Sequence, residues 1–332
     1  MEPTSHPTRR PTVPAAEEIL GGYFPVLDHG FVALVDYMGT DDSVERAARV
    51  SYGYGTRKVS ATRGLVRYLR RHLHTTPSEM VEFKFHCAMP MFVARQWIRH
   101  RTASVNEYSG RYSLMPLLFY SPEQDQFSLQ SATSNQGRAP GSVDPDFYRE
   151  AMRRWEDVRA RAADDYGWLV GENVARELAR IDLPLSTYTQ WYWKIDLHNL
   201  LHFLTLRVDD HAQWEIQEYG RVMAGMVKRV APLSYEAWVD YQVMGDKLSG
   251  AEIAALSRLV AVDADGVAAR SGAGLTNSDL AGLGLSGREI RELKEKLVPR
   301  EVPDYELDLT QMRDPQDVAA EMDRAVPEVD RG

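Results

Sequence analysis

Residues 99–113 form the part of the sequence best suited to binding an anion. They read RHRTASVNEYSGRYS and include three arginines and three serines. A guanidinium group offers paired donors that match two phosphate oxygens, and hydroxyl groups and loop amides can fill the remaining acceptor directions. Gly110 allows close approach of a ligand to the backbone. A solvated basic loop is the competing interpretation, but small and apolar residues interrupt the charges, which favours a pocket for a phosphorylated small molecule.

A second polar cluster covers residues 196–211 and begins with DLHNLLH. His198 and His202 are four residues apart and therefore share one face of a helix. Such a pair can bind a metal, but Asn199 stands where the H-E-x-x-H motif has its glutamate, and two hydrogen-bonded histidines are the simpler interpretation. Arg207 flanks a stripe of leucine and phenylalanine, so it needs an anionic partner if it is buried.

Three further features resemble functional motifs but have simpler explanations. Residues 282–287 (GLGLSG) match the G-x-G-x-x-G pattern, yet no strand precedes them, as a dinucleotide-binding fold requires. Cys87 lies in an alternating apolar segment and is expected to be a small buried hydrophobic residue. Arg70 and Arg71 are expected on the solvated face of a helix.

Composition restricts the class of protein. The chain has 332 residues, 44% of them hydrophobic, and a formal charge of −9. These values exclude a collagen-like, disordered or membrane-spanning protein, and the acidic balance argues against a general nucleic-acid binder. The single cysteine excludes internal disulfides and multi-cysteine metal sites. The first residues lack the apolar segment of a secretory signal, so we expect a cytoplasmic protein with no membrane partner.

Periodicity and capping residues predict a mixture of strands and helices. Strands are expected over residues 31–37, 80–89 and 185–194. Helices are expected over residues 41–48, 61–74, 91–101, 146–180, 197–208 and 211–230, the fifth of them with Asp196 as its N-cap. Residues 102–113 and 121–145 are expected to be loops.

The chain divides into three parts at the level of composition. Residues 1–15 are rich in proline and threonine and are expected to be disordered. Residues 16–245 are expected to form the catalytic domain, and residues 246–332 a helical C-terminal appendage with a flexible end. Within the appendage, LSGAEI and LSGREI at residues 248–253 and 285–290 predict two similar helix starts.

The first cluster resembles the signature of the flavin-dependent thymidylate synthases, RHRxxSxNxxSxRYS, at every signature position. HTTPSE at 74–79, FVARQW at 92–97 and LRVDDHAQWEIQ at 206–217 are also similar to that family, so the resemblance covers about residues 25–240. It implies an α+β fold, an antiparallel sheet packed with helices, assembled as a homotetramer with active sites between subunits. It also implies reductive methylation of dUMP to dTMP, with methylenetetrahydrofolate as carbon donor and NADPH-reduced FAD as hydride source. The family uses no cysteine nucleophile. That is consistent with this chain, whose single cysteine, Cys87, is expected to be a small buried hydrophobic residue.

The resemblance also implies roles for individual residues. Arg111 and Arg180 would hold the phosphate of dUMP, with Arg180 contributed across a subunit interface. Arg207 would contact the uracil and stabilise its deprotonated nitrogen 3, and Ser109 would position or polarise the substrate. The implied dUMP-binding residues are Gln96, Arg99, Glu107, Ser109, Gly110, Arg111, Arg180 and Arg207.

The implied FAD contacts lie partly in the second cluster. They are Thr76, Arg99, His100, Arg101, Glu107, Asp196, His198 and His202, with His74 in the folate and flavin region. Some family members have Asn, Arg and Asn in place of Asp196, His198 and His202, so the flavin would meet different donors here. Asp196 only accepts hydrogen bonds when it is ionised.

Two other functions remain open from the residues alone. A metal-dependent hydrolase of a phosphorylated nucleotide would use His198, His202 and an acidic residue. A non-catalytic nucleotide- or RNA-binding module would use Arg99, Arg101 and Arg111. Bound metal without flavin would favour the first, and steeply salt-dependent RNA binding would favour the second.

Overall fold

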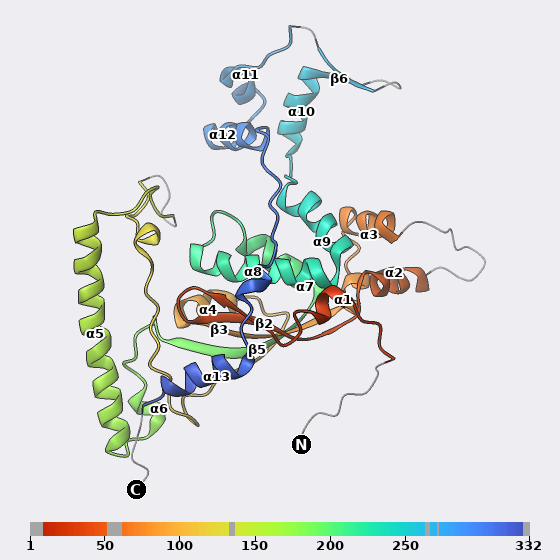
Figure 1. Ribbon diagram of the computed structural model, residues 1–332. Helices are drawn as coiled ribbons and strands as arrows, with labels where there is room; N and C mark the ends of the chain where they lie inside the picture. Colours follow the sequence, from red (N-terminus) through yellow and green to blue (C-terminus); the bar gives the residue numbers. More distant parts are fainter. Residues whose placement is uncertain (1–8, 52–61, 133–136, 263–265, 271, 328–332) are drawn as a thin grey trace. The chain divides into compact units, whose positions relative to one another are not determined.

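The computed structural model describes residues 9–51, 62–132, 137–262, 266–270 and 272–327 (Figure 1). The chain separates into two compact units. The second unit is Val239–Asp304, and the first consists of the described residues on either side of it. Within the described residues, no helix combines the length and the apolar character needed to cross a membrane.

An antiparallel sheet forms the centre of the first unit. Its strand order is β1-β2-β3-β5-β4, and every neighbouring pair is antiparallel. The strands are β1 Tyr23–Val26, β2 Gly30–Met38, β3 Glu82–Pro90, β4 Ser104–Glu107 and β5 Tyr188–Asp196. The predicted combination of helices with an antiparallel sheet is therefore confirmed, and so are the three predicted strands.

Helices cover both faces of this sheet. In Figure 1, α7 and α8 lie on one face and α13 lies on the other. The helices of the first unit are α1 Pro14–Glu17, α2 Asp41–Val50, α3 Thr62–Arg71, α4 Met91–Trp97, α5 Pro145–Gly171, α6 Arg176–Ala179, α7 Leu197–Arg207, α8 Trp214–Val230, α9 Pro232–Trp238 and α13 Pro315–Arg324. Short 3-10 turns occur at η1 Thr76–Met80, η2 Gln124–Gln126 and η4 Leu309–Gln311.

Alternation along β3 and β5 creates the core beneath α7 and α8. On β3 the side chains of Phe83, Phe85 and Cys87 are fully buried on one face. Burial raises the pKa of the Cys87 thiol well above its usual value, which confirms the prediction of an unreactive buried cysteine. Trp97 of α4 meets Trp193 of β5 edge-on, with ring centroids 5.3 Å apart. This aromatic core fixes the end of α4, from which residues 99–101 leave.

Two predicted segments differ from the structure. Residues 104–107 form strand β4 instead of a loop, because they pair with β5 in register from Ser104 opposite Lys194 to Glu107 opposite Trp191. The predicted helix over residues 146–180 is interrupted between α5 and α6, where Asn173 adopts a left-handed φ of 58°. The pairing of β4 with a distant strand and the positive φ of a single residue leave little trace in the local sequence. Local propensity therefore predicts neither of them.

The chain ends differ from the predicted domain boundaries. Of the segment predicted to be disordered, residues 1–8 lie outside the described residues. Arg10 pairs with Asp36 at 3.2 Å, and the backbone N–H of Val13 donates to the Tyr37 hydroxyl at 2.9 Å. At the other end, residues 305–327 belong to the first unit, and the N–H of Arg313 donates to the carbonyl of Tyr23 at 2.8 Å. The appendage therefore does not extend from residue 246 to the C-terminus.

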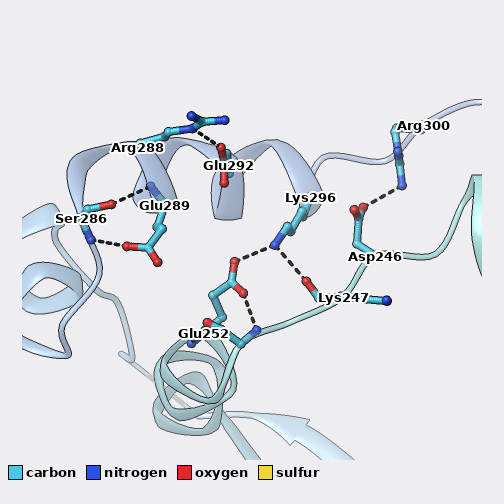
Figure 2. A network of polar contacts seen from close by, with 10 residues as sticks. Asp246, Lys247, Glu252, Ser286, Arg288, Glu289, Glu292, Lys296 and Arg300 are labelled. Carbon is cyan, nitrogen blue, oxygen red and sulfur yellow. Dashed lines mark hydrogen bonds and ion pairs between the residues drawn. The ribbon is translucent and has the colours of Figure 1, made fainter. Parts of the chain in front are cut away.

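The second unit has its own small core and an internal polar network. It comprises η3 Val239–Val243, α10 Gly250–Leu259, β6 Val260–Val262, β7 Val267–Ala269, α11 Asn277–Gly282 and α12 Gly287–Lys296, packed around Ala255, Leu280, Leu285, Ile290 and Leu293. Figure 2 shows the ion pair between Lys296 and Glu252 and the cap at Ser286.

The two LSGxEI segments are similar helix starts, as predicted. Ser249 with Glu252, and Ser286 with Glu289, each form a reciprocal capping box. The glycine-rich match at residues 282–287 joins the end of α11 to the start of α12. The element directly before it is a helix and not a strand, which agrees with its dismissal as a dinucleotide-binding motif.

Candidate active site

Arg207, the last residue of α7, contacts both the end of α4 and the segment that follows it. Its Nε donates to Nε2 of His100 at 3.0 Å, and an Nη donates to the backbone carbonyl of Gln96 at 3.4 Å. Burial lowers the pKa of the Arg207 guanidinium. Among the described residues, no carboxylate forms an ion pair with Arg207. The site thus contains a partly desolvated cation whose protein partners are neutral.

His100 is the neutral partner of this cation. Burial, together with the nearby charges of Arg207 and His202, lowers its pKa to about 4. At neutral pH the imidazole is therefore uncharged, and its Nε2 accepts the hydrogen bond from Arg207.

A cavity of about 360 Å³ joins the two clusters that were singled out in the sequence. We call five of its polar residues, together with the adjacent Gln96, the Arg207 group. The group consists of Gln96, Arg99, His100, Arg101, His202 and Arg207; Asn199 also lines the cavity. Tertiary packing of α7 against the end of α4 thus creates a polar cavity large enough for part of a planar ligand.

Asp196 is confirmed as the N-cap of α7. One of its carboxylate oxygens accepts from the backbone N–H of Asn199 at 2.9 Å, and the other accepts from the Asn199 side chain at 2.7 Å. Asp196 therefore orients Asn199. In the sequence, Asn199 is notable only because it replaces the glutamate of the H-E-x-x-H metal motif.

His198 and His202 differ in their surroundings. Nδ1 of His198 is buried and has no hydrogen-bond partner in the described part of the chain, whereas His202 is exposed. Burial lowers the pKa of His198, and the charge of Arg70 lowers it further. Within the described parts of the chain, no three His, Cys, Asp or Glu side chains are grouped so that they could hold a metal.

Arg70 is not on a solvated face, so that prediction is wrong. Its Nη2 atom is buried and has no hydrogen-bond partner among the described residues, whereas the neighbouring Arg71 is exposed. Adjacent to α3, His74 and Thr76 line a second cavity of about 870 Å³ together with Tyr68. The periodicity of α3 could have identified position 70 as inward-facing, because Val66 and Leu69 on the same helix are buried.

A separate set of candidate residues surrounds Gly110, and we call it the Arg180 group: Ser109, Gly110, Arg111 and Arg180. A Cβ atom at Gly110 would lie 2.7 Å from the sulfur of Met115 and 3.0 Å from Cδ of Arg180, so any larger residue would displace these side chains. The hydroxyl of Ser109 accepts from the backbone N–H of Arg111 at 3.3 Å. Arg180 thus lies against Gly110 in the same chain, and its contribution to dUMP binding across a subunit interface stays a prediction.

An ion pair that the sequence did not predict also forms at the Arg180 group. Arg111 donates from Nε to Glu177 at 2.9 Å, and both side chains are more than half exposed. Glu107, at the end of β4, accepts from the hydroxyl of Thr189 at 2.8 Å. Among the described residues, no hydrogen bond or ion pair joins the Arg180 group to the Arg207 group.

Gln213 is another residue without an assignment from the sequence. Its side-chain oxygen accepts a hydrogen bond from the amide of Gln96. This bond orients the Gln96 side chain, and the backbone carbonyl of Gln96 accepts the hydrogen bond from Arg207. The only signal in the sequence was its place in the LRVDDHAQWEIQ segment.

These features define an α+β protein with a desolvated cationic cavity and a separate arginine-rich loop, a combination suited to a phosphorylated ligand. A family model described as "Thymidylate synthase complementing protein" matches residues 33–233. Curated proteins named flavin-dependent thymidylate synthase are similar to this chain. The one from Gluconobacter oxydans is 51% identical over 257 residues (76% of this chain and 84% of that protein), and the one from Ruegeria pomeroyi is 47% identical over 296 residues (87% and 92%).

A solved structure is also similar. The UMP/dUMP methylase PolB from Streptomyces cacaoi, bound with 5-Br UMP, aligns with a TM-score of 0.60 and 32% identity over 66% of this chain and 97% of that one. The chain belongs to the flavin-dependent thymidylate synthase family. The matched residues contain both groups of candidate side chains, whereas Val239–Asp304 lies outside them.

Proposed function

We propose that this protein is a flavin-dependent thymidylate synthase that methylates dUMP reductively to dTMP. Methylenetetrahydrofolate would supply the carbon, and FAD reduced by NADPH would supply the hydride. The observation that carries the proposal is Arg207, a partly buried cation that contacts neutral His100 and, within the described residues, no carboxylate. Such a cation is free to stabilise negative charge that develops on a bound ligand. Family membership supplies the identity of that ligand as a uridine nucleotide.

The substrate would be held at its two ends by different arginines. Arg111 and Arg180 would bind the phosphate, because forked guanidinium groups match its oxygens and Gly110 lets the backbone approach closely. Arg207 would face the uracil ring and favour the form deprotonated at nitrogen 3, which makes the ring more nucleophilic. Ser109 would position the substrate through its hydroxyl group. The further dUMP contacts are Gln96, Arg99 and Glu107.

The donor set of the cavity fits a flavin nucleotide. Arg99, Arg101, Asn199 and His202 offer donors around a space of about 360 Å³, and the unpartnered Nδ1 of His198 can accept or donate according to its tautomer. The residues that would hold FAD are Thr76, Arg99, His100, Arg101, Glu107, Asp196, His198 and His202, with His74 beside the folate and flavin region. When it is bound, the flavin supplies the hydride chemistry. The neutral His100 keeps Arg207 oriented without cancelling its charge.

A homotetramer would complete the site. Supporting this, the Arg180 group and the Arg207 group are not joined by hydrogen bonds within the described chain, so a second copy could bring one beside the other. Large apolar side chains are also exposed along α5 and the segment after it: Phe147, Val158, Trp168, Leu178, Ile181 and Leu185. A cytoplasmic location follows from the proposed use of folate and NADPH.

Formation of dTMP by the purified protein tests this function. The reaction would contain dUMP, methylenetetrahydrofolate and NADPH, with and without added FAD. We expect product that depends on FAD. Folded, flavin-bearing protein that makes no dTMP would contradict the proposal, and release of phosphate from dUMP in the presence of added metal would favour a hydrolase instead.

A further inference from the structure

Arg70 is a charged side chain for which the described structure provides no partner. It lies near the end of α3, and its Nη2 atom is buried without a hydrogen bond. Desolvation lowers the pKa of Arg70 to about 10, so the guanidinium is still protonated at neutral pH. A buried cation is normally compensated by an anion or by a full set of acceptors. Arg70 thus has the properties of a residue whose partner is a ligand.

Two carboxylates near His198 do not neutralise the charge of Arg70 by an ion pair. Asp196 and Glu79 both act electrostatically on His198, the neighbour of Arg70. The carboxylate of Asp196 is engaged by Asn199 at both oxygens. In the part of the chain that the structure describes, neither Asp196 nor Glu79 forms an ion pair with Arg70.

His198 provides the second, independent observation at this place. Its Nδ1 is also buried without a partner, although it belongs to α7 and not to α3. Two elements far apart in the sequence thus bring two unsatisfied polar groups together, close enough for the charge of Arg70 to act on the imidazole. The combination of a forked cation and an imidazole is suited to the oxygens of a phosphate or diphosphate.

The surroundings indicate which anion would be bound. His198 and Thr76 are among the residues that would hold FAD. His74 is assigned to the folate and flavin region, and it lines the cavity of about 870 Å³ together with Thr76. The phosphate of dUMP has its own arginines in the Arg180 group. NADPH also carries phosphate groups, but His198 and Thr76 are assigned to the resident cofactor, so the diphosphate of FAD is the anion that these residues would meet.

We propose that Arg70, with His198, binds the diphosphate of the flavin dinucleotide. This assignment rests on the proposed function. It makes Arg70 a determinant of cofactor specificity: a flavin with a diphosphate is retained, and a flavin without one gains nothing from this residue.

Flavin affinity of the full-length protein, measured by isothermal titration with FAD and separately with riboflavin, tests this assignment. In Arg70→Gln we expect at least a tenfold loss of affinity for FAD and a change of less than twofold for riboflavin. The matched control is Arg71→Gln, which removes the same charge from the exposed neighbour on α3 and is expected to leave both affinities within twofold. ADP, which carries the diphosphate without the flavin ring, should compete with FAD in the wild type.

Each alternative outcome separates this inference from the proposed function. If Arg70→Gln binds FAD as tightly as the wild type, or loses riboflavin affinity equally, the diphosphate assignment is wrong while the proposed function stands. If the wild type binds no FAD, both fail. Should Arg70→Gln not fold, Arg70→Lys replaces it, because lysine keeps the charge but lacks the forked donors. We then expect at least a threefold loss for FAD only, and unchanged FAD affinity would overturn the assignment.

Discussion

The Arg207 group and the Arg180 group are built in opposite ways. Arg207 is partly buried between α7 and α4 and faces a neutral imidazole, whereas Arg111 is more than half exposed and already paired with Glu177. An exposed ion pair of this kind contributes about 0–1 kcal/mol, so a phosphate can displace Glu177 at little cost. A desolvated cation without a counter-ion interacts strongly with any charge that develops beside it. The difference indicates that the first group serves the chemical step and the second serves binding.

The largest effect is expected from Arg207→Ala. Loss of the cation at the uracil should reduce kcat by about 10²–10³, which corresponds to about 3–4 kcal/mol of transition-state stabilisation. Flavin content should remain, since Arg207 is not among the residues that would hold FAD. Steady-state kinetics and the flavin absorbance of the same preparation measure both quantities. The control is Arg161→Ala, which removes an exposed arginine paired with Asp165 on α5; turnover of Arg207→Ala near that of this control would eliminate the role.

Removal of the exposed arginine should act on binding instead. Arg111→Ala is expected to weaken dUMP affinity about 10- to 100-fold, as loss of a charge-assisted bond of about 1.5–3 kcal/mol implies. Its kcat at saturating dUMP should fall far less than that of Arg207→Ala. Titration with dUMP measures the affinity. Glu177→Gln is the complementary variant and should bind dUMP as well as or slightly better than the wild type, because it frees Arg111. Unchanged dUMP affinity in Arg111→Ala would remove the contrast between the groups.

Gly110→Ala should disturb the Arg180 group and leave the Arg207 group unchanged. The added methyl group would lie 2.7 Å from Met115 and 3.0 Å from Arg180, so both side chains must move. We expect a loss of about 1–3 kcal/mol in the free energy of unfolding and a several-fold weaker affinity for dUMP. Thermal denaturation and dUMP titration measure these effects. Gly167→Ala in α5 is the control, because nothing lies within 4 Å of its added Cβ; equal effects of the two substitutions would contradict the packing argument.

The smallest effect is a pH dependence confined to the Arg207 group. His100 has a pKa of about 4 in the folded protein, against about 6.5 when unfolded, so the unfolded state binds more protons between these values. The stability associated with neutral His100 is therefore present above pH 6.5 and is lost as the pH falls toward 4. Because the side chain is only half buried, we expect this to account for about 2–4 °C in Tm.

Melting curves of the wild type and His100→Gln across pH 4–7 measure this contribution. The wild type should lose more Tm toward pH 4 than the variant does. Other histidines titrate in both proteins, so the difference between the curves isolates His100. Parallel curves would show that His100 is not held in its neutral form.

Several features could be predicted from the sequence because short-range interactions determine them. The N-cap at Asp196 and the capping boxes at Ser249 and Ser286 involve residues three positions apart. The buried side of β3 follows from alternation alone. Strand β4 was missed because its polar sequence gives no apolar period, and only pairing with β5 makes it a strand.

The sequence by itself determined which arginines, serines and histidines are available for chemistry and that they have the spacing of the family signature. It also determined where the helices that carry them begin. Tertiary structure alone decided how those residues are divided. Arg207 meets His100 across 107 positions of sequence, and Gly110 meets Arg180 from another element. Burial then left His100 neutral and left Nη2 of Arg70 without a hydrogen-bond partner among the described residues. Desolvation depends on what packs around a group, and the packing partners of these residues come from distant parts of the chain.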